Sequence, residues 1–106
     1  MIDISLYTTS KGQLLGFRIK GHSGYSEQGS DIVCAAVSSA TIMTANTITE
    51  ILHISCELNA DEGDMMLRIM QRDAAACRDI LEGFKLHLTQ LEEQYSEYIK
   101  VNYTEV

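Results

Sequence analysis

Apolar residues recur with two different periods along this chain of 106 residues, and the order of these periods limits the folds that it can adopt. Alternation of apolar and polar residues, or a short apolar run bounded by turn residues, is typical of a strand. These patterns predict strands at 2–7, 15–20, 55–60, 66–70 and 99–104. Turn-forming residues at 9–12 and 61–64 join the first two and the next two strands, so we expect two hairpins.

Two further segments have the period of a helix. In the first, from Asp31 to about residue 52, apolar or small residues recur three or four positions apart, at Val33, Val37, Ala40, Thr44, Ile48 and Ile51. Residues 32–49 carry no charge and are long enough to cross a membrane. They nevertheless contain seven Ser, Thr or Asn residues, which favours a buried helix of a soluble domain. Asp73 is a plausible N-cap for the second helix, whose stripe is Cys77, Ile80, Leu81, Phe84, Leu88, Leu91 and Tyr95.

The predicted order is therefore ββαββαβ, an α+β fold in which two helices pack on a mainly antiparallel sheet. We expect one domain over residues 1–106, because the chain contains no linker or low-complexity segment. Its net charge of -7 argues against non-specific nucleic-acid binding and is compatible with a basic partner. Three cysteines without a CxxC pair, and a start without a basic and apolar leader, favour a reducing cytoplasm.

The loop after the second predicted strand brings a base and a thiol into one segment. His22 follows that strand, and Cys34 lies three or four residues after a helix N-cap at Ser30 or Asp31. A helix N-terminus and a nearby imidazolium both favour the thiolate, which is the nucleophilic form of cysteine. Unbonded amides at the same helix end could also hold an oxyanion during acyl transfer. This combination predicts a cysteine nucleophile with a histidine base.

Five neighbouring residues could support such a pair. Asp31 could cap the helix or orient His22, although a carboxylate directly beside Cys34 would oppose thiolate formation. Ser38 lies one turn after Cys34 on the same helix face and could bind substrate, His22 or its own helix. The glycines that would let the loop fold back are Gly21, Gly24 and Gly29.

Simpler explanations apply to the same residues. A cysteine near a helix start is more often a small buried hydrophobe than a nucleophile, and a lone histidine is usually structural. Cys56, in a predicted strand, and Cys77, on the apolar stripe, are interpreted as packing residues. We expect no metal site or cofactor, because two ligands do not complete a metal site and the glycines lack a phosphate-loop pattern.

The combined motif resembles that of the bacterial ribosomal-processing cysteine proteases, called Prp. The matching residues are Gly-His-Ser-Gly at 21–24, then Gly29, then Asp-Ile-Val-Cys-Ala-Ala-Val-Ser at 31–38. The motif covers about a sixth of the chain, and the order of predicted elements fits the family over its full length. The resemblance implies that Cys34 is the catalytic cysteine and His22 the catalytic histidine, with Asp31 and Ser38 as supporting residues. Ser23 departs from the small residue, often alanine, expected there, and residues 25–28 vary in the family.

The same resemblance implies a function. Members of this family are small cytoplasmic endopeptidases, generally homodimeric, that remove an N-terminal extension from the twenty-seventh large-subunit ribosomal protein. Its implied partners are therefore this extension and a second copy of the chain, without nucleic acid or membrane. Two alternatives stay open: a different thiol enzyme, such as an acyltransferase or a redox sensor, and a non-catalytic ribosome-assembly module in which Cys34 only packs.

Overall fold

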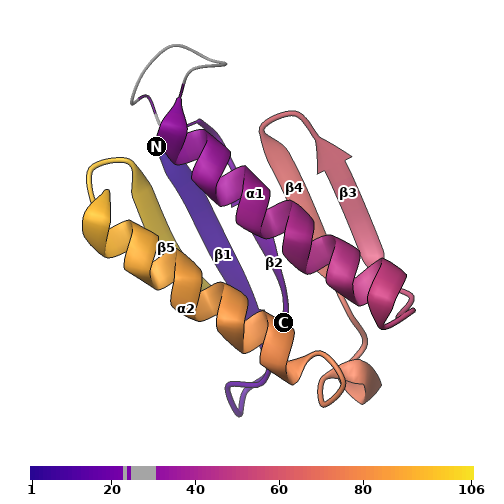
Figure 1. Ribbon diagram of the computed structural model, residues 1–106. Coiled ribbons are helices and arrows are strands. Elements are labelled where there is room, and N and C mark those ends of the chain that lie inside the picture. Colours follow the sequence, from indigo (N-terminus) through magenta and orange to yellow (C-terminus); the bar gives the residue numbers. More distant parts are fainter. Residues whose placement is uncertain (23, 25–30) are drawn as a thin grey trace.

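A computed structural model describes residues 1–22, 24 and 31–106 as one sheet covered by two helices (Figure 1). The strands are β1 (Ile2–Thr8), β2 (Leu14–Lys20), β3 (Glu57–Asp61), β4 (Asp64–Arg68) and β5 (Ile99–Glu105). The helices are α1 (Ile32–Asn46), which continues as a π-helix (Thr47–Ile51), a short 3-10 helix (Gln71–Asp73), and α2 (Arg78–Gln94). The predicted order ββαββαβ is confirmed.

The sheet has the strand order β3-β4-β2-β1-β5. β1 with β2, β2 with β4, and β3 with β4 pair antiparallel, whereas β5 runs parallel to β1. The two predicted hairpins therefore lie side by side through β2 and β4, and α2 carries the chain back to the far edge (Figure 1). The sheet is mainly antiparallel, as predicted, with one parallel edge.

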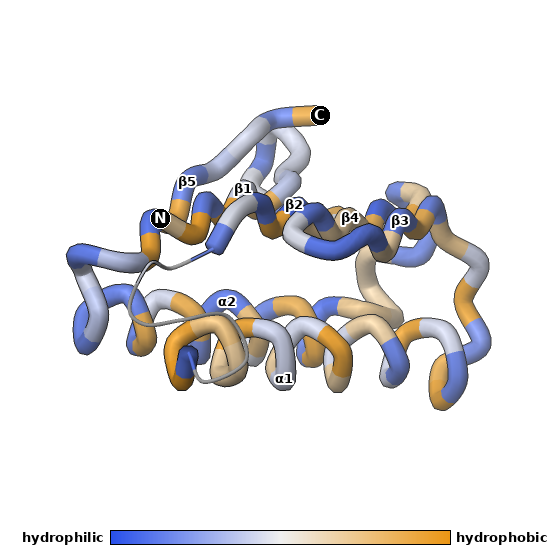
Figure 2. Tube along the Cα trace, turned by 90° about the horizontal axis from the view of Figure 1, so that it is seen from above, coloured by the Kyte–Doolittle hydropathy of each residue, from blue (hydrophilic) through white to orange (hydrophobic). Residues whose placement is uncertain are grey.

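Both helices cover the same face of the sheet, so the core lies between two layers (Figure 2). Alternate residues of the inner strands enter this core, among them Ile4, Phe17 and Leu67. The rings of Phe17 and Phe84 have centroids 4.8 Å apart and are tilted by 54°, a favourable aromatic arrangement. The apolar stripe of α2 is confirmed, since its central residues Leu81, Phe84 and Leu88 are buried.

The uncharged segment forms one long helical stretch over Ile32–Ile51. By length and composition it could cross a bilayer. In the fold, one of its faces packs against the sheet and α2, with Val33, Val37 and Ile48 fully buried. Ile51, predicted on that face, is instead 71% exposed. The reason is the π-helix, because its i→i+5 bonds place more residues in each turn and rotate Ile51 off the stripe.

Two local predictions are wrong. Asp73 does not cap α2; it ends the 3-10 helix, its carbonyl accepts from the amide of Cys77, and α2 begins only at Arg78. Cys56 lies just before β3 rather than within it. Both errors arise where the chain turns into the core, and there packing outweighs local preference.

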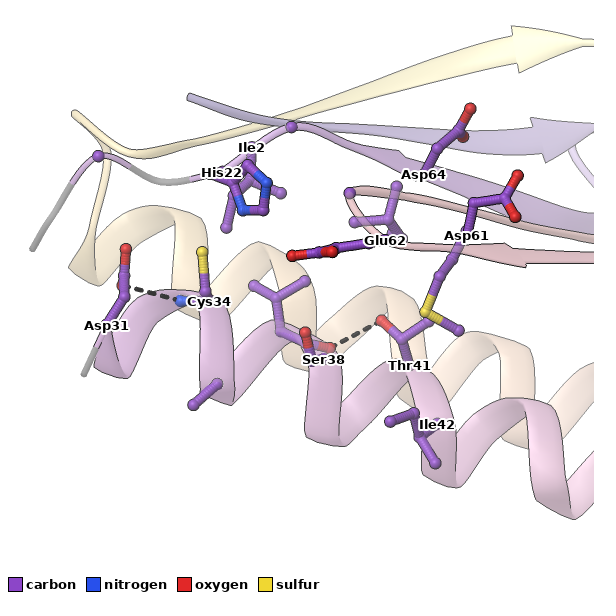
Figure 3. A pocket seen from close by; sticks show the side chains of 17 residues that line it. Ile2, His22, Asp31, Cys34, Ser38, Thr41, Ile42, Asp61, Glu62 and Asp64 are labelled. Atoms are coloured by element: carbon purple, nitrogen blue, oxygen red, sulfur yellow. Dashed lines mark hydrogen bonds between the residues drawn. The ribbon is translucent and has the colours of Figure 1, made fainter. Parts of the chain in front are cut away.

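Four segments meet at one end of the molecule. Lys20, at the end of β2, pairs with Asp3 near the start of β1 and with Asp64 at the start of β4. The tip of the β3–β4 hairpin is therefore held beside the point where the chain leaves β2. The N-terminus of α1 lies opposite these strand ends (Figure 3).

Candidate active site

The strand ends and the start of α1 enclose a cleft of about 450 Å³. His22 and Cys34 both line it, together with Asp31 and Ser38. Figure 3 shows the Cys34 thiol pointing up from α1 and the His22 ring entering the same space from the strand layer. The fold therefore brings together the two residues that the sequence indicates, although the described residues between them that precede α1, 24 and 31, belong to no helix or strand.

Cys34 lies in the first turn of α1, as predicted, and is partly exposed. Asp31 is the N-cap: one of its carboxylate oxygens accepts hydrogen bonds from the amides of Val33, at 2.9 Å, and Cys34, at 3.0 Å. The residue is 7% exposed. These bonds fix the first helical turn, and with it the place of the thiol, so the structure assigns Asp31 the capping role.

Three amides at this helix start already have acceptors. Those of Val33 and Cys34 donate to the Asp31 side chain, and that of Ala35 donates to the Asp31 carbonyl at 3.0 Å. An oxyanion could bind these amides only by displacing Asp31. These three amides therefore do not form an oxyanion hole in this conformation, although the positive end of the helix still faces the cleft.

His22 is held through its backbone on two sides. The amino nitrogen of Met1 donates a hydrogen bond to the His22 carbonyl at 2.6 Å. The amide of Gly21 donates to the carbonyl of Gly63 at 2.9 Å. The histidine is thereby attached to the start of β1 and to the tip of the β3–β4 hairpin, while its ring stays exposed to the cleft.

The supporting residues are placed as follows. Ser38 lies one turn beyond Cys34 and is exposed along the cleft. Gly21 and Gly24 line the cleft and have φ angles of 92° and 74°, conformations that favour glycine. Gly29, Ser23, Ser30 and residues 25–28 lie outside the described residues.

One wall of the cleft, the tip of the β3–β4 hairpin, contains the acidic residues Asp61, Glu62 and Asp64, and Ile19 and Ile42 contribute apolar surface to the lining. Figure 3 shows the Glu62 carboxylate turned into the cleft, whereas the carboxylates of Asp61 and Asp64 point away from α1. The sequence indicates residues 61–64 only as a turn. Their position at the site follows from the pairing of β4 with β2, which no local pattern indicates.

Asp64 in this wall forms an ion pair with Arg18. Its carboxylate accepts two hydrogen bonds from the Arg18 guanidinium, at 3.0 and 2.8 Å. The Arg18 hydrogen bonds hold the pKa of Asp64 below its usual value, and Asp64 in turn raises the pKa of Arg18. The pair attaches the hairpin to β2, so it supports the wall mechanically.

The other two thiols differ from Cys34. Cys77 is fully buried and Cys56 packs against the core, which confirms both as packing residues. Burial raises the pKa of each thiol. Among residues 1–22, 24 and 31–106, no group of three or more His, Cys, Asp or Glu side chains is arranged to hold a metal ion.

Known proteins are similar to this chain in both sequence and fold. The sequence profile of the family described as Cysteine protease Prp matches residues 1–100. The ribosomal processing cysteine protease Prp of Staphylococcus aureus is 28% identical over 105 residues, which cover 97% of this chain and 99% of that protein.

Solved structures agree with this similarity. A crystal structure of the essential S. aureus ribosomal processing protease Prp with a covalently linked product peptide superposes with a TM-score of 0.90 and 27% identity. The superposition covers 98% of this chain and 100% of the S. aureus chain. The same protease with a substrate peptide gives a TM-score of 0.85 and 26% identity over 98% and 100% of the two chains. A Streptococcus mutans protein gives a TM-score of 0.82 and 27% identity over 100% and 99%.

Proposed function

The chain belongs to the cysteine protease Prp family and is a cysteine protease, and we propose that it removes the N-terminal extension of a large-subunit ribosomal protein, the twenty-seventh of bacteria. We propose Cys34 as the nucleophile and His22 as the base. The observation that carries the assignment is that both side chains line one cleft, from opposite layers of the fold (Figure 3). Relatives named as ribosomal processing proteases, one of them solved with a substrate peptide, support the choice of substrate.

The chemistry follows from the two groups. His22 takes the proton of the Cys34 thiol, and the thiolate attacks the scissile carbonyl to form a tetrahedral intermediate. This intermediate collapses to a thioester as the peptide C–N bond breaks, and His22 gives its proton to the leaving amine. Water, deprotonated by His22, then hydrolyses the thioester and regenerates the thiol. The N-terminus of α1 favours the negative sulfur and oxygen electrostatically.

The charges of the cleft are compatible with a basic polypeptide. The chain has a net charge of -7, and the hairpin that forms one wall of the cleft carries Asp61, Glu62 and Asp64, of which Glu62 turns its carboxylate into the cleft (Figure 3). Complementary charge accelerates encounter and orients a substrate more than it adds affinity. A basic ribosomal protein would be attracted to this end of the molecule.

The decisive experiment uses the ribosomal protein of the same organism with its extension intact. Purified enzyme is incubated with it, and the products are identified by mass spectrometry, alongside Cys34→Ala and His22→Ala. One defined cut that both variants lose supports the proposal. If Cys34 is readily alkylated but the ribosomal protein stays intact, the substrate is wrong and a different thiol-enzyme activity is favoured. A cut that survives in Cys34→Ala refutes the assigned nucleophile.

Cytoplasmic location and a homodimer belong to the same proposal. Three thiols without a disulfide suit a reducing compartment. Cell fractionation with an antibody tests the location, and light scattering coupled to gel filtration tests the dimer. A mass equal to one chain across the concentrations used for activity would refute the dimer.

A further inference from the structure

We propose that Gly63, at the tip of the β3–β4 hairpin, is a positioning residue whose missing side chain provides the space for the His22 imidazole. The inference rests on the proposed role of His22 as the base. Gly63 lies 41 positions after His22 in the chain, and no sequence pattern links them. The pairing of β4 with β2 brings them together.

The steric evidence comes from the contact between Gly63 and the ring. A Cβ atom added at Gly63 would lie 3.2 Å from His22 Nε2, 3.7 Å from Cε1 and 3.9 Å from Cδ2. Carbon and nitrogen atoms at van der Waals contact are usually separated by about 3.5 Å or more. The ring edge that carries Nε2 therefore lies directly against the hairpin tip. Any side chain at position 63 would push the ring away by a few tenths of an ångström.

The backbone of the same glycine fixes the chain next to the ring. The Gly63 carbonyl accepts from the Gly21 amide at 2.9 Å, and the His22 carbonyl accepts from the Met1 amino nitrogen at 2.6 Å. The backbone around His22 is thus held while its side chain packs on Gly63. Displacement of the ring by a new side chain would have to occur as rotation of the His22 side chain, which changes its direction toward Cys34.

The hairpin tip itself is anchored. The ladder between β2 and β4 reaches Lys20 and Asp64, and Arg18 bonds both carboxylate oxygens of Asp64. Consequently the hairpin cannot yield easily to a larger residue at position 63. The exposed histidine ring is the part that moves.

A matched control separates the contact from backbone strain. Gly63 has a φ of 73°, so any L-residue there is strained as well as crowded. Gly12, in the turn between β1 and β2, has a φ of 83° and nothing within 4 Å of an added Cβ. The β1–β2 register places this turn at the opposite end of the two strands from His22. Gly12→Ala therefore introduces comparable strain without touching the site.

The experiment compares Gly63→Ala, Gly12→Ala, His22→Ala and the unchanged protein. Cleavage of a synthetic peptide that spans the end of the ribosomal extension gives kcat and KM, and urea unfolding gives stability. We expect Gly63→Ala to lower kcat about 10- to 100-fold with little change in KM, since small displacements of catalytic groups have effects of this size. Gly12→Ala should lose similar stability and keep its kcat.

Alkylation by iodoacetamide provides a readout that needs no substrate. If His22 assists ionisation of Cys34, Cys34 in Gly63→Ala should be alkylated more slowly than in the unchanged protein in neutral buffer. Cys34 in His22→Ala should be slowed as well. The rates should converge in alkaline buffer, where hydroxide ionises the thiol without help from His22. A purely structural effect of the substitution would not produce this pH-dependent difference.

The outcomes are distinct. If His22→Ala cleaves normally, the assigned base is wrong and the role of Gly63 falls with it. If His22→Ala is inactive but Gly63→Ala folds and keeps its kcat, the role of Gly63 is refuted and that of His22 stands. The role of Gly63 is also refuted if Gly12→Ala loses as much kcat as Gly63→Ala. Should Gly63→Ala fail to fold, Gly63→Asn replaces it, with Gly12→Asn as control, because Asn tolerates positive φ. Normal kcat in Gly63→Asn would refute the inference as well.

Discussion

Replacing Asp31 by alanine should loosen the first turn of α1 and thereby the support of Cys34. One oxygen, Oδ1, accepts from both the Val33 and the Cys34 amides. Alanine leaves these two donors without an acceptor at a helix end that α1 cannot satisfy internally. Because Asp31 is only 7% exposed, water replaces the carboxylate incompletely.

The expected loss is about 2 kcal/mol, the upper part of the range for an N-cap replaced by alanine, since two amides lose their acceptor. With a urea dependence of about 1.5 kcal/mol per molar, the unfolding midpoint should fall by about 1.3 M. Asp31→Asn is the matched control, because the asparagine side chain keeps an oxygen at the position of Oδ1. It loses only the interaction of a negative charge with the helix dipole, about 0.3–1 kcal/mol.

Urea unfolding followed by circular dichroism measures all three proteins under identical conditions. The urea midpoint should be highest for the unchanged protein, lower for Asp31→Asn and lowest for Asp31→Ala. An alanine variant within about 0.5 kcal/mol of the unchanged protein would refute the reasoning, because a change of that size is ordinary for any surface site. An asparagine variant as unstable as alanine would show that charge, rather than the two hydrogen bonds, stabilises the turn.

Three further outcomes are expected. Gly16→Ala should abolish folding or lower its midpoint severely, because the new Cβ would overlap the β4 backbone and φ is 149°; a cooperative transition near the original midpoint would contradict this. The ion pair of Asp64 with Arg18 should stabilise the fold fully above the ordinary aspartate pKa of about 3.9, with the stabilisation lost as pH falls through the lowered pKa. Asp64→Asn should remove this loss of stability at low pH, as measured by unfolding down to about pH 3. If both proteins lose stability equally as the pH falls, the prediction is refuted. Iodoacetamide at neutral pH should modify Cys34 first and Cys77 last, since Cys77 is fully buried with a raised pKa; mass mapping that finds Cys77 first would contradict the structure.

Local patterns predicted most of the secondary structure. The alternation over 2–7 and 15–20 and the turn between them depend only on neighbouring residues, and the β1–β2 hairpin is confirmed. The stripe of α2 is equally local and is also confirmed. The errors at Ile51 and Asp73 have a different origin. The π-helix rotates Ile51 away from the buried face, and a turn that packs into the core separates Asp73 from the start of α2.

The candidate site was predicted in part. The position of Cys34 in a first helical turn and of His22 just after a strand are short-range properties, and both agree with the fold. The capping alternative for Asp31 is the one that the structure supports. The acidic wall was missed, because its residues lie in a turn that carries no chemical signal of its own.

By itself, therefore, the sequence determined the elements, their order, and which thiol stands at a helix N-terminus, because spacing and capping act over a few residues. Only the tertiary structure decided what surrounds His22. Its contacts with Gly63 and Met1 depend on the strand order β4-β2-β1, which brings distant parts of the chain together at one end of these strands. Strand order is set by packing of the whole core, and local patterns are the same for several such orders.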